Sequence, residues 1–315
     1  MRAGAARGVR LWLVVLVVVV LYGLLSRDLG WMHSVANAFM FVALVQAWNV
    51  LGGYGGYMNF GMAAFFGVGA YTTGILFQSF ALPAYITTLA AGVMGMAFGL
   101  MVGLLTLRLR GAYFAIFTLI VTFAVQLATL TADFTQGSLG IYLPILSLEP
   151  RQIEQLFYFV FLLIAVLSTV AVYLVERSRF GVALVAIRED EDAAEALGIR
   201  TTRVKVAALM IGGLIAGVAG GIYSRQVLYI EPIGTFAIDT SLNVVLMAVV
   251  GGAGSWQGPL LGVPLVMLVA DGLRVGIEGV LNRVILGVLL VLVALLMPDG
   301  VTGLIQGRRR RRLTV

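Results

Sequence analysis

The sequence lacks most of the side chains from which catalytic and metal sites are built. It contains no cysteine and a single histidine, His33, among 315 residues. Without thiols there can be no disulfide framework, no cysteine-ligated metal and no thiol nucleophile. A lone histidine has no partner ligands, so we interpret His33 as a polar residue at a membrane interface. We therefore expect the chain to have no catalytic residue and to bind neither a metal nor a cofactor.

Charged residues are also scarce. They make up 11% of the chain while 61% of it is hydrophobic, whereas soluble domains carry about 25% charged residues. A soluble globule is excluded because there is too little polar surface to cover one. Apolar runs approach the ~20 residues that cross a bilayer as a helix, and the short alternating segments of a membrane barrel are missing. We predict an all-α polytopic transmembrane bundle. The clearest runs are residues 11–25, 35–51, 83–107, 113–130, 156–175 and 206–228.

The positions of lysine and arginine predict the orientation, because these residues concentrate on the cytoplasmic side of a membrane. With the N-terminus inside, the cytoplasmic segments contain 16 of the 21 basic residues. Both termini are then cytoplasmic, and residues 306–315 form a basic tail that anchors the last helix and does not bind nucleic acid. We expect residues 1–315 to form one transmembrane domain in the lipid of the bacterial inner membrane.

Two segments leave the number of spans open. Residues 239–270 must leave and return to one side around a glycine-rich turn, and each arm has only about a dozen residues. We predict eight full helices plus either a re-entrant pair or two short helices, which gives 8–10 spans. The N-terminal run could be a signal peptide, but no small-residue cleavage site follows Leu25, so we favour an uncleaved first helix.

Residues 176–205 form the only long, highly charged stretch. Acidic residues 189–192 precede Ala193, Ala194 and Leu197 at helical spacing, and Gly198 provides a stop. This pattern predicts a two-turn helix with a small apolar face that docks into a partner's groove. It fits equally well a solvated loop that its charges keep out of the membrane.

Glycine is abundant, and polar residues lie beside its first cluster, at residues 52–56, and its last cluster, at residues 251–262. In membranes, small residues allow close helix packing, which explains many of the 39 glycines, and they also allow helices to break. The two clusters resemble each other loosely, which indicates two related halves with a solute path between them. The residues predicted to form this path or its helix breaks are Asn49, Gly52, Tyr54, Gly55, Asn59, Gly61, Gly252, Gly254, Ser255, Gly258 and Pro259.

The helix interiors lack two kinds of energy-coupling group. No helix centre carries the Asp, Glu or Lys expected of a proton relay, which disfavours an ion-driven carrier. No Gly-x-x-x-x-Gly-Lys-Ser/Thr motif is present, so the chain cannot hold ATP in a P-loop. Any nucleotide energy must therefore come from another subunit.

Several sequence blocks, which follow one another in the family's order, resemble the permeases of branched-chain amino acid ABC importers. They resemble LivM-type subunits more than LivH-type ones. The most specific are Asp-Ala-Ala-Glu-Ala-Leu-Gly-Ile at 192–199 and Gly-Gly-Ala-Gly-Ser-Trp-Gln-Gly-Pro at 251–259. The other matching blocks are residues 48–56, 63–71, 107–116, 137–141 and 180–188.

The resemblance implies a complete importer around this chain. It implies a second, LivH-like permease subunit, two cytoplasmic ABC ATPases that carry the ATP and Mg²⁺, and a periplasmic solute-binding protein. It also implies that the acidic segment is the coupling helix that meets the ATPase. The residues implied to carry the coupling are Arg188, Asp192, Ala193, Ala194, Leu197 and Gly198.

The solute and the transport class have alternatives. Leucine, isoleucine and valine are the solutes that the resemblance favours, but Asn59, Met62 and Gln136 depart from the common pattern. Urea or a short amide is therefore a second possibility. A carrier or channel that works without ATP would need no docking helix, and a purely structural scaffold would make no use of the paired glycine clusters.

Overall fold

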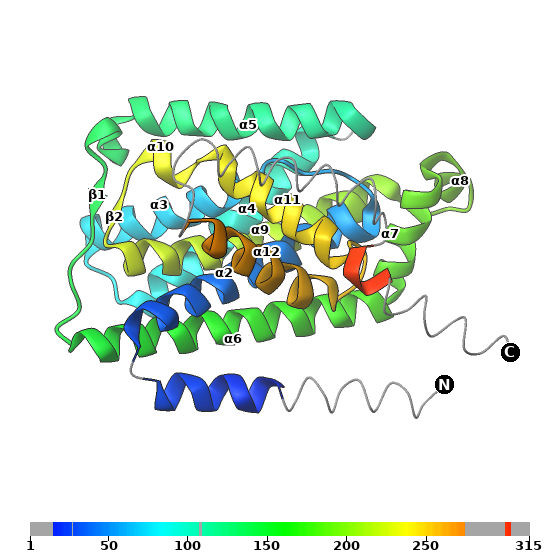
Figure 1. The fold of residues 1–315 in the computed structure, drawn as a ribbon. Helices are drawn as coiled ribbons and strands as arrows, with labels where there is room; N and C mark the ends of the chain where they lie inside the picture. The colour runs from blue at the N-terminus through cyan, green and yellow to red at the C-terminus, as the bar shows by residue number, and fades with distance from the viewer. Residues whose placement is uncertain (1–14, 27, 107–108, 275–299, 304–315) are drawn as a thin grey trace, which may run out of the picture.

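The computed structural model describes residues 15–26, 28–106, 109–274 and 300–303, which form an elongated bundle of helices (Figure 1). The longer helices are Val15–Leu25, α2 (Leu29–Gly55), α3 (Met62–Phe80), α4 (Ala84–Leu105), α5 (Gly111–Thr131), α6 (Pro150–Arg177) and α9 (Thr201–Val227). The shorter elements are η1 (Asp133–Thr135), η2 (Gly137–Leu139), β1 (Ile141–Tyr142), α7 (Arg179–Glu189), α8 (Glu191–Ala196), β2 (Tyr229–Ile230), α10 (Pro232–Thr235), α11 (Ile238–Gly251) and α12 (Gly258–Arg274).

The predicted all-α transmembrane class is confirmed. Among the described residues, six stretches are long and apolar enough to cross a membrane: α2, α4, α5, α6, α9, and α10 with α11. Each run predicted from hydropathy coincides with a helix, although residues 11–14 of the first run and residue 107 of the third lie outside the described residues. The last predicted crossing, before residue 298, also lies outside them.

The paired segment of residues 239–270 forms two helices joined by a turn. α11 ends at Gly251, residues 252–257 form the turn, and α12 returns from Gly258. The two predicted arms correspond to α11, with 14 residues, and α12, with 17. Together α10 and α11 extend over Pro232–Gly251, which is long and apolar enough to cross a membrane. The choice between a re-entrant pair and two short helices stays a prediction.

The core forms where glycines let helix backbones touch. A Cβ added at Gly69 of α3 would lie 2.1 Å from the carbonyl oxygen of Gly217 in α9, and one at Gly95 of α4 would lie 2.2 Å from that of Gly213. Helices at this distance gain close van der Waals contact that larger side chains would prevent. α9 is thus the central helix, with α2, α3 and α4 packed around it.

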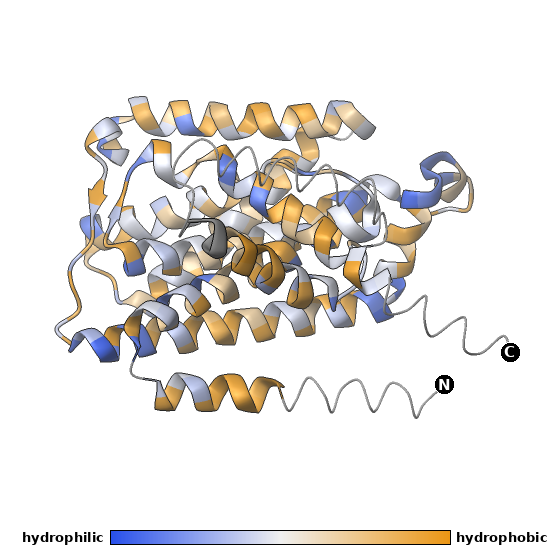
Figure 2. Cartoon of the chain, viewed as in Figure 1, coloured by the Kyte–Doolittle hydropathy of each residue, from blue (hydrophilic) through white to orange (hydrophobic). Residues whose placement is uncertain are grey.

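The bundle has two distinct ends. The strand end consists of η1, η2 and the antiparallel pair β1–β2, in which Ile141 lies opposite Ile230. The α8 end consists of α7, α8 and the 252–257 turn. Figure 2 shows hydrophobic residues along the long helices and hydrophilic ones gathered at α8 and at the ends of α6. This pattern is expected when the middle of a bundle faces hydrocarbon and its ends face water.

Candidate coupling and hinge site

The acidic segment folds into the short helix that the sequence predicts. The Asp190 carboxylate caps it by accepting a hydrogen bond from the Ala193 amide at 2.9 Å. At the other end Gly198 adopts a positive φ of 88° with open space around it. Glycine is therefore favoured there by backbone conformation, since L side chains rarely adopt it. A stiff, capped turn results.

The apolar residues of α8 do not share one face. Leu197 is 82% exposed and Ala193 is exposed, whereas Ala194 is only 2% exposed and turns toward the bundle. The expectation that all three would form a single docking face was wrong for Ala194. Ala193 and Leu197 stand four residues apart, one helical turn, so they form the outward patch. Ala194 holds the other side of α8 against the protein.

Glu191 joins α8 to the transmembrane helices. One of its carboxylate oxygens lies 2.6 Å from Lys205 Nζ, and the other lies 3.2 Å from Arg110 Nε and accepts a hydrogen bond from the Tyr57 hydroxyl. Arg110 also pairs with Asp192 at 2.8 Å. Tyr57 follows α2, Arg110 precedes α5 and Lys205 lies in the first turns of α9. A single carboxylate thus connects α8 to three helices.

The environment fixes the charges of this cluster. The side chains of Glu191 and Lys205 are only 10% and 9% exposed. Burial acts to raise the pKa of Glu191, but hydrogen bonds from Lys205 and Tyr57 and the charges of Lys205 and Arg110 outweigh it and lower the pKa. Burial and the bond to Glu191 raise the pKa of Tyr57. At neutral pH the carboxylate is therefore ionised and the phenol is a neutral donor.

Sequence reasoning did not find Glu191, Tyr57, Arg110 or Lys205 as site residues. One signal was available, because Lys205 is the only lysine beside 20 arginines. A lysine carries a compact charge that fits a small buried site, whereas arginine needs room for its planar fork.

Arg188 connects α7 to both glycine clusters. Its Nη1 donates to the Gly53 carbonyl oxygen at 3.3 Å, and a Cβ added at Gly254 would lie 3.2 Å from the same nitrogen. Its side chain also covers Gly56, where a Cβ would approach Arg188 Cγ to 2.5 Å. Arg188, expected to act in coupling, therefore binds Gly53 and lies against Gly254, one of the predicted break residues.

The first and last glycine clusters meet at the α8 end. Asn49 of α2 donates from Nδ2 to the Ser255 carbonyl oxygen at 2.9 Å and accepts from the Gly254 amide at 2.8 Å. A Cβ at Gly53 would lie 2.5 Å from the Gly254 nitrogen. The Tyr54 hydroxyl donates to Glu176 Oε2, and the same oxygen accepts from the Trp256 amide at 3.2 Å. The structure thus brings together residues that the sequence placed in two separate clusters.

The helix breaks lie at fewer glycines than expected. α2 continues through Gly52, ends at Gly55 and is capped by Gly56, which has a φ of 74°. Gly252 and Gly254, with φ of 107° and 78°, shape the turn after α11. Gly52 therefore lies inside a helix, and its predicted role as a break was wrong, whereas Gly55 is the last residue of α2 and borders the break at Gly56.

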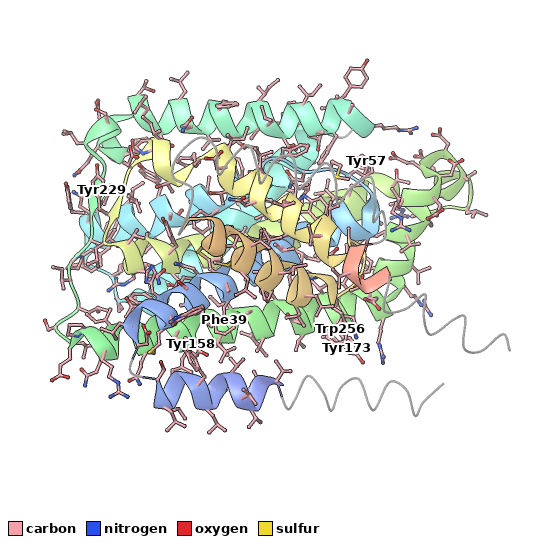
Figure 3. All side chains as sticks on the ribbon, in the orientation of Figure 1. Phe39, Tyr57, Tyr158, Tyr173, Tyr229 and Trp256 are labelled. Atoms are coloured by element: carbon pink, nitrogen blue, oxygen red, sulfur yellow. The ribbon has the colours of Figure 1, made fainter. Side chains whose placement is uncertain are left out.

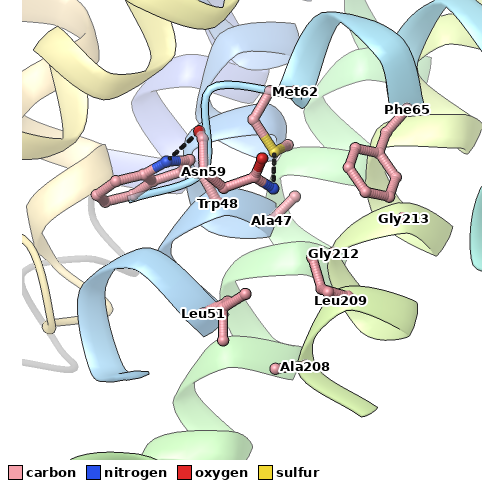
Figure 4. A pocket seen from close by; sticks show the side chains of 10 residues that line it. All are labelled: Ala47, Trp48, Leu51, Asn59, Met62, Phe65, Ala208, Leu209, Gly212 and Gly213. Carbon is pink, nitrogen blue, oxygen red and sulfur yellow. Dashed lines mark hydrogen bonds between the residues drawn. The ribbon is translucent and has the colours of Figure 1, made fainter. Parts of the chain in front are cut away.

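The remaining predicted path residues shape turns. Asn59 accepts from the Gly61 amide through its side chain at 2.8 Å and from the Trp48 indole through its carbonyl at 2.9 Å. Asn59 and Trp48 border a cavity of about 10 Å³ (Figure 4), roughly one water molecule in size. Gly258 and Pro259 open α12. A role of these residues in solute passage remains a prediction.

The comparisons with known proteins decide the family. The family model described as branched-chain amino acid transport system / permease component matches residues 32–294. The chain belongs to this family. The resemblance predicted from the sequence blocks is thereby confirmed, and the permease is a multi-pass membrane protein.

This permease is similar to several named permease proteins. It is 28% identical to the high-affinity branched-chain amino acid transport system permease protein LivM of Salmonella typhimurium, over 92% of this chain and 74% of the relative. Identity to LivH of the same organism is 37%, over 40% of each chain. The ribose import permease protein RbsC of Bacillus subtilis is 30% identical over 39% of this chain and 40% of the relative. No solved structure matches.

Proposed function

We propose that this permease is the LivM-like transmembrane subunit of an ABC importer and forms part of the path for leucine, isoleucine and valine. The long match to LivM supports this solute class, because it extends over nearly the whole chain. Urea or a short amide is the second candidate, since Asn59 and Met62 depart from the common pattern.

We further propose the partners and the orientation that the family implies. A LivH-like subunit completes the permease, two ABC ATPases bind ATP and Mg²⁺, and a periplasmic protein delivers the solute. The α8 end faces the cytoplasm of the inner membrane. Basic residues support this orientation, because the loop and helices at the α8 end carry Arg177, Arg179, Arg188, Arg200 and Arg203.

The observation that carries the proposal is the Glu191 cluster. α8 presents Ala193 and Leu197 outward, while its inward side is fixed to the start of α9, to Arg110 before α5 and to the loop after α2. When the ATPase dimer closes on α8, the helix moves as a rigid lever. Because Glu191 joins it to three helices, that movement reaches the transmembrane bundle.

The last glycine cluster extends the same path for movement. Arg188 and Asn49 link α7 and α2 to the 252–257 turn. A displacement of α7 therefore moves the junction of α11 and α12 as well as α2. Positive φ at Gly252 and Gly254 lets this junction adopt backbone angles that other residues resist.

The test uses the assembled importer in proteoliposomes. Leu197→Asp places a charge on the outward patch, and Gly198→Arg strains the cap. Both should abolish uptake and co-purification with the ATPase. Glu195→Gln, on an exposed position of the same helix, is the matched control and should keep both. If uptake and complex formation survive both site variants, the coupling assignment is wrong.

Two further measurements separate the alternatives. Uptake by the permease without ATP would favour a carrier or channel. Calorimetry of the cognate binding protein with leucine, isoleucine, valine and urea identifies the solute, because this protein selects the cargo. Heat on urea injection alone would replace the amino-acid proposal with the urea alternative.

A further inference from the structure

An apolar groove with a volume of about 460 Å³ runs along α6. Its walls come from the helix Val15–Leu25, from α2, from α6 and from α12, and its volume falls within the roughly 300–1,000 Å³ of ordinary ligand sites. The four walls include, in that order, Val19, Val42, Val166, and Leu260 with Pro264. None of the groove's lining residues belongs to the Glu191 cluster, and Trp256 of the 252–257 turn is the one lining residue on the proposed coupling path.

The lining of the groove selects an apolar occupant. Thr169 is one of its few polar residues, and its hydroxyl donates to the Ala165 carbonyl oxygen at 2.7 Å and accepts from Gln46 at 3.2 Å. The hydroxyl is therefore already satisfied. An amino acid or a sugar would leave its own polar groups unpaired against this wall, which disfavours its binding, whereas a hydrocarbon chain has no polar group to leave unpaired.

The groove ends at the α8 end in a polar mouth, where Arg177 lies beside Tyr173 and the Glu176 carboxylate accepts from the Trp256 amide. Tyr173 and Trp256 line it with their rings edge to face, 5.5 Å apart between centroids, and Figure 3 places the two side by side. The Arg177 guanidinium stacks over the Tyr173 ring at 4.4 Å. Arg177 is exposed and makes no ion pair within the described part of the chain. Aromatic rings and arginine in this arrangement are typical of the membrane–water interface.

The length of the groove matches one leaflet. Along α6 it extends from Leu162 to Tyr173, a rise of roughly 17 Å at ~1.5 Å per residue. Half of the ~30 Å hydrocarbon core is about 15 Å. Its far end lies at Phe39, which packs against Tyr158 with ring centroids 5.2 Å apart, and Figure 3 shows this pair well separated from Tyr173 and Trp256.

We propose that the groove binds an acyl chain of an anionic phospholipid from the leaflet at the α8 end, with the phosphate on Arg177. The acyl chain fills the space between the helix Val15–Leu25 and the bundle. Tyr158 and Gln155 also join this helix to α6, by hydrogen bonds to the carbonyl oxygens of Val19 and Gly23. The lipid thus adds to the attachment of the first helix.

The test is photo-cross-linking of the assembled importer with phosphatidylglycerol that carries a diazirine in its acyl chain. Mass spectrometry should find label on the helix Val15–Leu25, α6 and α12. Arg177→Gln should lower the labelling about fivefold, the effect of removing one basic residue near an anionic surface. Val170→Trp, at a half-exposed lining position, should obstruct the groove and remove most of the label.

The control is Arg179→Gln, which removes a nearby exposed arginine of α7 that does not stack on Tyr173; its labelling should equal that of the unaltered importer. Equal labelling by a phosphatidylcholine probe would overturn the anionic selectivity. Labelling that resists both Arg177→Gln and Val170→Trp, or a cross-link from the groove to a peptide of the second permease, would overturn the site itself.

Discussion

The α8 end and the strand end of the bundle are held together by different forces. Of the five ion pairs within the described residues, four lie at the α8 end, and the fifth joins His33 to Glu154 near the strand end. The strand end is instead closed by the backbone pairing of β1 with β2 and by apolar contacts, in which Tyr71 stacks on Phe236 at 5.6 Å beside buried Ile141 and Ile230.

This difference indicates where the molecule can switch. Charged and hydrogen-bonded contacts are directional, so they favour one arrangement over another and can be exchanged as units. Apolar contacts are non-directional, and the β1–β2 pair at the strand end fixes one register through backbone hydrogen bonds that contain no charged group to exchange. We infer that the α8 end transmits movement, while the strand end caps the bundle.

The largest effect should follow from breaking the Glu191 cluster. Glu191→Ala leaves Lys205 buried without its carboxylate, which costs about 3–5 kcal/mol when one member of a buried pair is removed. We expect loss of ATP-driven uptake and a clear fall in thermal unfolding temperature. Glu189→Ala, which removes an exposed pair with Arg188, is the control and should change unfolding little. Equal effects of the two substitutions would contradict the special role of Glu191.

The glycines should rank by conformation and by what surrounds them. Gly252→Leu forces a side chain onto a φ of 107° and should abolish uptake while the protein still inserts into the membrane. Gly55→Leu should also impair uptake but less severely, because the nearest atoms to its Cβ are side-chain methyls of Leu51 and Leu184 at 3.2 and 3.3 Å, which can move. Uptake assays with surface-expression controls measure both. Normal uptake by Gly252→Leu would leave these glycines with an incidental packing role.

The charge of Glu191 gives the α8 end a pH dependence of known sign. Its pKa in the folded protein is lowered, so the unfolded chain binds the proton more tightly. The stabilisation is then fully present above the unfolded value of about 4.3 and is lost as the pH falls through the folded value. The protection of the α8 amides, measured as the intrinsic exchange rate at each pH divided by the observed rate, should stay constant from pH 7 to 5 and fall only below the unfolded value. A fall in protection already at pH 6 would contradict this assignment.

The sequence predicted the elements of this molecule better than their meeting points. Hydropathy identified α2, α4, α5, α6 and α9 because each contains a long apolar run, whether the helix is largely exposed like α5 or largely buried like α9. It missed α3 as a clear run, because Tyr-Thr-Thr-Gly at 71–74 lowers the hydropathy of this helix.

The candidate site shows the same limit at the level of side chains. Local spacing was enough to predict α8, since its Asp190 cap and Gly198 stop are neighbours in sequence. It could not predict that Glu191 meets Tyr57, 134 residues away, or that Asn49 holds Ser255, 206 residues away. Such contacts depend on how whole helices pack, and one sequence contains no direct signal for them.

The smallest effect should come from the strand-end ion pair. His33 Nδ1 and Glu154 Oε2 lie 3.3 Å apart, with side chains 48% and 24% exposed. Exposed pairs contribute about 0–1 kcal/mol, because water screens them and two side chains must be ordered. His33→Gln should therefore leave uptake unchanged and shift the unfolding temperature by no more than a degree or two. A loss of uptake as large as that of Glu191→Ala would mean that the strand end also transmits movement, and the division of labour between the two ends would fail.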